Sequence, residues 1–96
     1  MKLSISEAVR QKLAIKHGGI TEVDIVECFA NREAGFLADK RADHQTNPPS
    51  QWFIAETNSG RKLKVVFMYH SDTKNIVIKT AYDANAEEIR IYKKYA

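Results

Sequence analysis

The sequence QWFIAETNSGRKLKVVFMYHSDTKNIVIKTAY, residues 51–82, decides the fold class of this chain. From residue 63 to residue 69 apolar side chains occupy every second position, which is the period of a strand with one face in a core. A hairpin turn is predicted at Asn58-Ser59-Gly60, and the β-branched run at 76–80 predicts another strand after a turn at 71–75. Residues 51–82 therefore predict three consecutive antiparallel strands joined by short turns.

A helix is predicted before this sheet, close to the N-terminus. Ser4 and Glu7 have the three-residue spacing of a capping box, in which a hydroxyl and a carboxylate bind each other's free backbone N–H groups. The helix should run to about residue 17, because Gly18-Gly19 is typical of a left-handed helix stop.

Two further capping signatures predict two more helices. Thr21 with Asp24 begins a helix that should end near Asn31, with an apolar stripe formed by Val23, Val26, Phe29 and Ala30. Asn85 with Glu88 begins a helix over residues 86–95, docked through Ile89 and Tyr92.

These elements together predict an α+β fold. A short strand is plausible at 36–41, and the polar, proline-containing segment 43–50 reads as a loop. The expected architecture is an N-terminal helical hairpin packed on a three- to four-stranded antiparallel sheet, with a C-terminal helix. A chain of 96 residues predicts a single domain, residues 1–96.

Composition narrows the cellular setting. The chain carries one cysteine, Cys28, so no internal disulfide is possible, and it has neither a membrane-length apolar run nor a signal-peptide pattern. A cytoplasmic protein without a membrane partner is predicted. The net charge of +3 is concentrated toward the C-terminal third, which favours an acidic or polyanionic partner.

Basic residues on the predicted sheet are the first candidates for a functional surface. Arg61, Lys62, Lys64 and Lys79 form a strip that can hold a phosphate backbone, although the same pattern also suits the solvated face of a one-sided sheet. His17, His44 and His70 are of the residue type that can exchange protons near neutral pH, but they lack the spacing of a zinc site. No phosphate-binding loop or dinucleotide motif is present, so no metal or nucleotide cofactor is predicted.

Three blocks of sequence stand out when they are taken in order. They are Lys16-His17-Gly18, then Gly60-Arg61-Lys62-Leu63-Lys64-Val65-Val66-Phe67, and Ile76-Val77-Ile78-Lys79-Thr80-Ala81-Tyr82 followed by Glu88 and Tyr92. In this order the blocks resemble the BrnT-type toxins, relatives of the RelE/ParE superfamily of bacterial toxin ribonucleases.

The resemblance implies a metal-independent endoribonuclease that acts on RNA and is held inactive by a cognate antitoxin protein. RNA cleavage needs an acid, a base and cations that stabilise the charged transition state. The resemblance assigns His17 as the acid or base and Arg61, Lys64 and Lys79 as the cations. Tyr82 or Tyr92 would assist as hydrogen-bond donors.

The chain departs from the family pattern at the end of the third block. Thr80-Ala81-Tyr82 stands where the family commonly has Ser-Ala-Arg, and tyrosine cannot replace a permanently charged phosphate ligand. A non-catalytic binding module of the same fold, with a protein or nucleic-acid partner, is therefore the alternative.

Similar chains also carry the label ADP-ribosyl-(dinitrogen reductase) hydrolase. Those hydrolases are larger helical proteins that bind paired magnesium ions through clustered carboxylates. Asp39, Asp43 and Glu56 do not form such a cluster in the sequence, so this function is the least favoured alternative.

Overall fold

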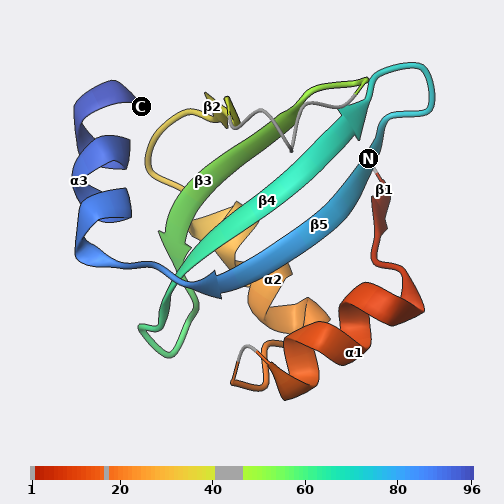
Figure 1. Ribbon diagram of the computed structural model, residues 1–96, viewed down its shortest axis with the longest axis horizontal. Coiled ribbons are helices and arrows are strands. Elements are labelled where there is room, and N and C mark those ends of the chain that lie inside the picture. The colour runs from red at the N-terminus through yellow and green to blue at the C-terminus, as the bar shows by residue number, and fades with distance from the viewer. Residues whose placement is uncertain (1, 17, 41–46) are drawn as a thin grey trace.

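The computed structural model describes residues 2–16, 18–40 and 47–96 (Figure 1). Its helices and strands confirm the α+β class. In chain order the elements are β1 (Lys2–Ser4), α1 (Glu7–Ile15), α2 (Glu22–Asn31), β2 (Leu37–Ala38), β3 (Ser50–Glu56), β4 (Lys62–His70), β5 (Asn75–Asp83) and α3 (Ala86–Tyr95).

The sheet has five strands in the order β1-β5-β4-β3-β2. The predicted meander is present as β3, β4 and β5, and β2 adds to β3 in antiparallel orientation. The prediction of a three- to four-stranded antiparallel sheet is corrected by β1, which pairs in parallel with β5 through Leu3 and Ile76. Three residues are too few to show a strand period, and their partner lies more than seventy positions away.

The first helix begins two residues later than its sequence suggests. Ser6 is the N-cap, and its hydroxyl accepts from the Val9 N–H at 3.2 Å. Ser4 belongs to β1 instead, where its hydroxyl donates to Asn75 Oδ1 at 3.0 Å. The capping box predicted at Ser4 and Glu7 is therefore wrong, because pairing with β5 holds Ser4 in a strand.

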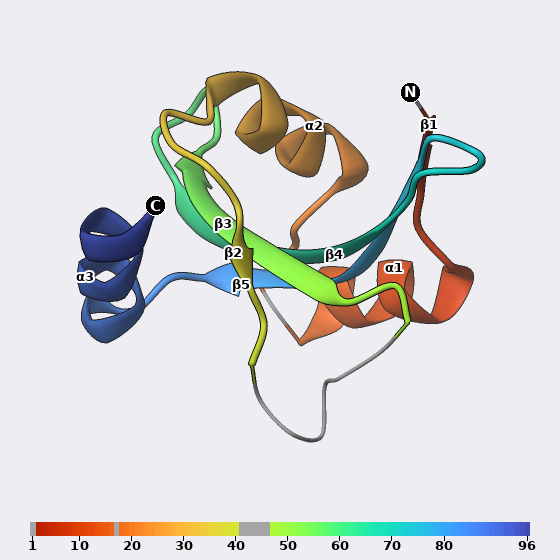
Figure 2. The same ribbon diagram turned by 90° about the horizontal axis from the view of Figure 1, so that it is seen from above.

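The two N-terminal helices lie on different sides of the sheet. Figure 2 shows α2 over one face, while α1 lies on the other side, beneath β5. The predicted helical hairpin on one face is thus not observed. Gly18 and Gly19, between the helices, both have positive φ angles (74° and 76°), which suit a sharp reversal of the chain.

Several of the most deeply buried side chains lie between α2 and the sheet. Phe53, Val65 and Phe67 pack there against Ile25 and Cys28 of α2.

The orientation of α2 corrects its predicted apolar stripe. Val23 and Val26 are 64% and 50% exposed, whereas Ile25 and Cys28 are fully buried. Of the predicted stripe, Phe29 does pack against the core. The Cys28 thiol donates to the Ala55 carbonyl at 3.6 Å, and burial raises the pKa of this thiol to about 11. Apolar side chains stand on more than one face of α2, and its packing on β3 and β4 decides which of them are buried.

The C-terminal helix follows its prediction closely. Both hydrogen bonds of the capping box between Asn85 and Glu88 are present. Tyr92 is buried against Trp52, with ring centroids 5.8 Å apart, and Ile89 is half-buried against the core. Within the described part of the chain, no helix combines the length and apolar character needed to span a membrane.

Candidate functional site

Three polar side chains from different elements meet at the end of the sheet next to α3. The register places Lys64 of β4 opposite Tyr82 of β5. Lys64 Nζ donates to Glu88 Oε2 at 3.0 Å, and Tyr82 Oη donates to the same oxygen at 2.9 Å. We call Lys64, Tyr82 and Glu88 the carboxylate cluster.

Lys64 is enclosed by other side chains, so the prediction that the lysines lie on a solvated face of the sheet is wrong for this residue. Its side chain is 9% exposed. Its ammonium lies 4.5 Å from the ring centroid of Trp52 and 5.7 Å from that of Tyr82, both within cation–π range. Trp52 is itself buried, so the lysine charge is held between aromatic rings and one carboxylate.

Electrostatics keep the Glu88 carboxylate charged and the Tyr82 phenol neutral. Burial alone would raise the pKa of Glu88, but hydrogen bonds from the Asn85 N–H, Lys64 and Tyr82 together lower it below its ordinary value. Burial, followed by the bond to Glu88, raises the pKa of Tyr82. The resting cluster is therefore an ammonium, a carboxylate and a protonated phenol.

Arg61 lies just before β4 and forms a second set of contacts, with Asp83 and Gly18. Its Nε and Nη2 donate to the two carboxylate oxygens of Asp83 at 2.7 and 2.9 Å, and this bond lowers the pKa of Asp83. Nη1 donates to the Gly18 carbonyl at 3.1 Å. A Cβ on Gly18 would lie 2.9 Å from Nη2, so the missing side chain makes room for the guanidinium.

Lys79 is the extra residue of a β-bulge. Val66 pairs with Thr80 and Phe67 with Ile78, which leaves Lys79 without a register partner. It lies about 10 Å along β5 from Tyr82. Among the residues that the structure describes, no carboxylate forms an ion pair with Lys79. His17 lies outside the described residues.

The structure therefore brings some of the predicted residues together and separates others. Lys64 and Tyr82 are in one cluster, Arg61 is attached to the next residue of β5 through Asp83, and Lys79 stands apart. Tyr92 donates to the Gly35 carbonyl at 2.7 Å instead of joining them.

Sequence reasoning missed Glu88 as a member of the site. It recognised this residue as a helix cap, and the same side chain does bind the Asn85 N–H. Its second carboxylate oxygen binds Lys64, 24 positions away, and no local pattern predicts a contact at that separation.

Carboxylates elsewhere do not assemble into a metal centre. In the parts of the chain that the structure describes, no group of three or more His, Cys, Asp or Glu residues is placed to hold a metal ion. Asp39 lies opposite Ser50 at the start of β3, and Glu56 ends that strand, about 20 Å away. Asp43, the third candidate for a magnesium cluster, falls outside the described residues.

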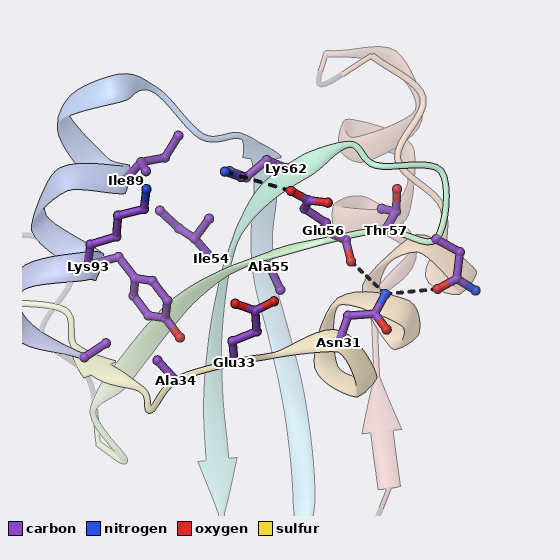
Figure 3. Close-up of a pocket in the computed structure, with 13 residues that line it drawn as sticks. Asn31, Glu33, Ala34, Ile54, Ala55, Glu56, Thr57, Lys62, Ile89 and Lys93 are labelled. Atoms are coloured by element: carbon purple, nitrogen blue, oxygen red, sulfur yellow. Dashed lines mark hydrogen bonds and ion pairs between the residues drawn. The ribbon is translucent and has the colours of Figure 1, made fainter.

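A cavity of about 780 Å³ opens beside α3, at the outer edge of β3 (Figure 3). Ile54 and Ala55 of β3 line it, together with Ile89 and Lys93 of α3 and Glu33 after α2. Arg61, Lys64, Lys79 and Tyr82 do not line this cavity, so it is separate from the carboxylate cluster.

No protein-family model matches this chain, and no curated protein matches it either.

Proposed function

We propose that this chain is the toxin of a toxin–antitoxin pair and cuts RNA in the cytoplasm without a metal ion. The supporting observation is that residues from all three blocks of the BrnT/RelE resemblance contact one another at one end of the sheet. Gly18 of the first block binds Arg61 of the second, and Lys64 of the second shares Glu88 with Tyr82 of the third.

The proposed chemistry is attack of a ribose 2′-oxygen on the neighbouring phosphorus, which forms a 2′,3′-cyclic phosphate and breaks the bond from phosphorus to the 5′-oxygen of the next nucleotide. Arg61 and Lys64 would stabilise the negative charge of the transition state, and the Tyr82 phenol would donate a hydrogen bond to a phosphate oxygen. His17 would act as the base for the 2′-hydroxyl or as the acid for the leaving 5′-oxygen, and water would complete the other proton transfer, because histidine is the residue type suited to exchange protons near neutral pH. RNA must displace Asp83 from Arg61 and Glu88 from Lys64 before it can bind these donors. Lys79, on its bulge, would therefore make the first contact with RNA.

Lys79 gives the cleanest test, because its replacement breaks no ion pair within the described structure. Lys79→Ala should weaken RNA binding at low salt and lower the slope of log affinity against log salt by about one. Lys94→Ala, on the exposed end of α3, is the matched control and should leave both unchanged. If the two variants have equal RNA affinity and salt dependence in a fluorescence-anisotropy titration, Lys79 does not contact RNA.

Catalysis is tested by induced expression and by RNA cleavage with purified protein in EDTA. Growth arrest and cleavage should both occur, and His17→Ala should abolish both while circular dichroism shows an unchanged fold. A folded wild-type protein that neither arrests growth nor cleaves RNA would contradict the ribonuclease proposal.

A non-catalytic binding module is the second candidate, and one observation favours it. Arg61 and Lys64 are each bound to a carboxylate, and tyrosine occupies the position where the family carries arginine. RNA binding without turnover, measured on the same purified sample, would select this candidate over the ribonuclease.

A further inference from the structure

The outer edge of β3 is covered by β2 along only part of its length. Leu37 pairs with Trp52, Ala38 pairs with Gln51, and the Asp39 N–H donates to the Ser50 carbonyl at 2.9 Å. The same register would set Gly35 opposite Ile54 and Glu33 opposite Glu56, but the pairing stops at Leu37. The Gly35 carbonyl accepts from Tyr92 of α3 at 2.7 Å instead, so the chain has left the sheet.

The backbone of β3 therefore presents hydrogen-bonding groups beyond the end of β2. Backbone groups alternate in direction along a strand, so those of Ile54 point to the same side as those of Ser50 and Trp52, away from β4. No residue of the described structure bonds to the Ile54 backbone on that side. The Glu56 carbonyl accepts from Asn31 Nδ2 at 2.9 Å, which leaves its N–H as a further edge donor.

The cavity beside α3 lies at this uncovered edge. Figure 3 shows Ile54 and Ala55 at the strand, Ile89 and Lys93 projecting from α3, and Glu33 on the opposite side. A volume of about 780 Å³ is within the range of about 300–1,000 Å³ found for ligand pockets. The space that a continued β2 would occupy is thus a groove with an apolar floor.

We propose that this groove binds an extended peptide segment of a partner protein, which adds to β3 as a short strand. An uncovered strand edge recognises the backbone of such a peptide through main-chain hydrogen bonds, and the groove beside it selects side chains. The groove accommodates about three or four residues in extended form.

The charges around the groove specify the side chains of the peptide. Lys62 lies 3.9 Å from Glu56, whereas no carboxylate of the described residues pairs with Lys93. Ile54 shares its face of the sheet with Lys64, which binds α3, so peptide side chains on that face meet α3 and Lys93. An acidic residue of the peptide belongs on this face, beside Lys93.

This inference goes beyond the proposed action on RNA and does not depend on it. Its test is an NMR titration of the full chain with blocked pentapeptides in which valine alternates with glutamate, threonine or lysine. The valine–glutamate peptide should shift the amide signals of Ile54 and Glu56 most strongly. A copy N-methylated along the edge that faces β3 should lose binding, because it cannot form the strand pairing.

Adjacent lysines on α3 supply the matched variants. Lys93→Glu should weaken binding of the valine–glutamate peptide by at least about fivefold, which corresponds to about 1 kcal/mol. Lys94→Glu, which makes the same charge change outside the groove, should bind within twofold of the wild type. The proposal is overturned if no peptide shifts the Ile54 and Glu56 signals, if N-methylation has no effect, or if both variants behave alike.

Discussion

Glu87 and Glu88 are neighbours on α3, and each forms an ion pair, yet the two pairs have different surroundings. Glu87 pairs with Arg90 one turn along the same helix, and both side chains are more than 60% exposed. Glu88 pairs with Lys64 of the sheet, and these side chains are 16% and 9% exposed. Water can solvate each charge of the first pair if the other is removed, but not the lysine of the second. The cost of losing a partner should therefore differ sharply between them.

The largest effect is expected for Glu88→Ala. The change leaves the Lys64 ammonium enclosed without its carboxylate and also removes the acceptor for the Asn85 N–H. We expect a loss of about 3 kcal/mol in the free energy of unfolding, because an enclosed charge then has no partner. Urea denaturation measures it, and a loss of under about 1 kcal/mol would show that the pair behaves like an exposed one.

Lys64→Met should lower the free energy of unfolding by less, about 2 kcal/mol, because the remaining Glu88 carboxylate keeps its hydrogen bonds from Tyr82 and Asn85. Combining it with Glu88→Gln removes both charges together. The double variant should be more stable than the sum of the single changes predicts, by about 1–2 kcal/mol. Strict additivity in this cycle would mean that the two groups are not coupled.

At acidic pH the wild type and Glu88→Gln should have the same free energy of unfolding. The pKa of Glu88 is lowered in the folded protein from an ordinary value of 4.5, so the folded state holds fewer protons than the unfolded state. Its stabilising contribution is therefore complete above pH 4.5 and is lost as the pH falls through the lower folded value. Denaturation curves at a series of pH values should converge on acidification. If the difference in the free energy of unfolding instead grew on acidification, the shift in the pKa of Glu88 would have the opposite sign.

The smallest effect is expected for Glu87→Ala. Its pKa is lowered by the hydrogen bond from Arg90, but both partners are solvated. The urea midpoint should stay close to that of the wild type, and added salt should reduce any remaining difference, because salt screens exposed charges. A loss as large as that of Glu88→Ala would abolish the contrast and would show that burial does not determine the cost of losing a partner.

Local chemistry was enough to predict several elements of this protein. The caps at Thr21 and Asn85, the extent of α3 and the presence of β4 as a strand could be predicted, because hydrogen bonds three residues apart and a two-residue period lie within one short segment. Burial along β4 does not alternate, because α2 and α3 cover its two faces. The docking of Tyr92 follows from the helical period of α3.

Only the tertiary structure decided what joins distant segments. It placed β1 beside β5, turned Ile25 and Cys28 of α2 inward in place of Val23 and Val26, and ended β2 short of Ile54. It also gave Glu88 its second partner, Lys64. The sequence determined which local shapes are possible, because backbone bonding and periodicity act over a few residues. The choice among them depended on which surfaces the folded chain could bury together, and that is a property of the whole molecule.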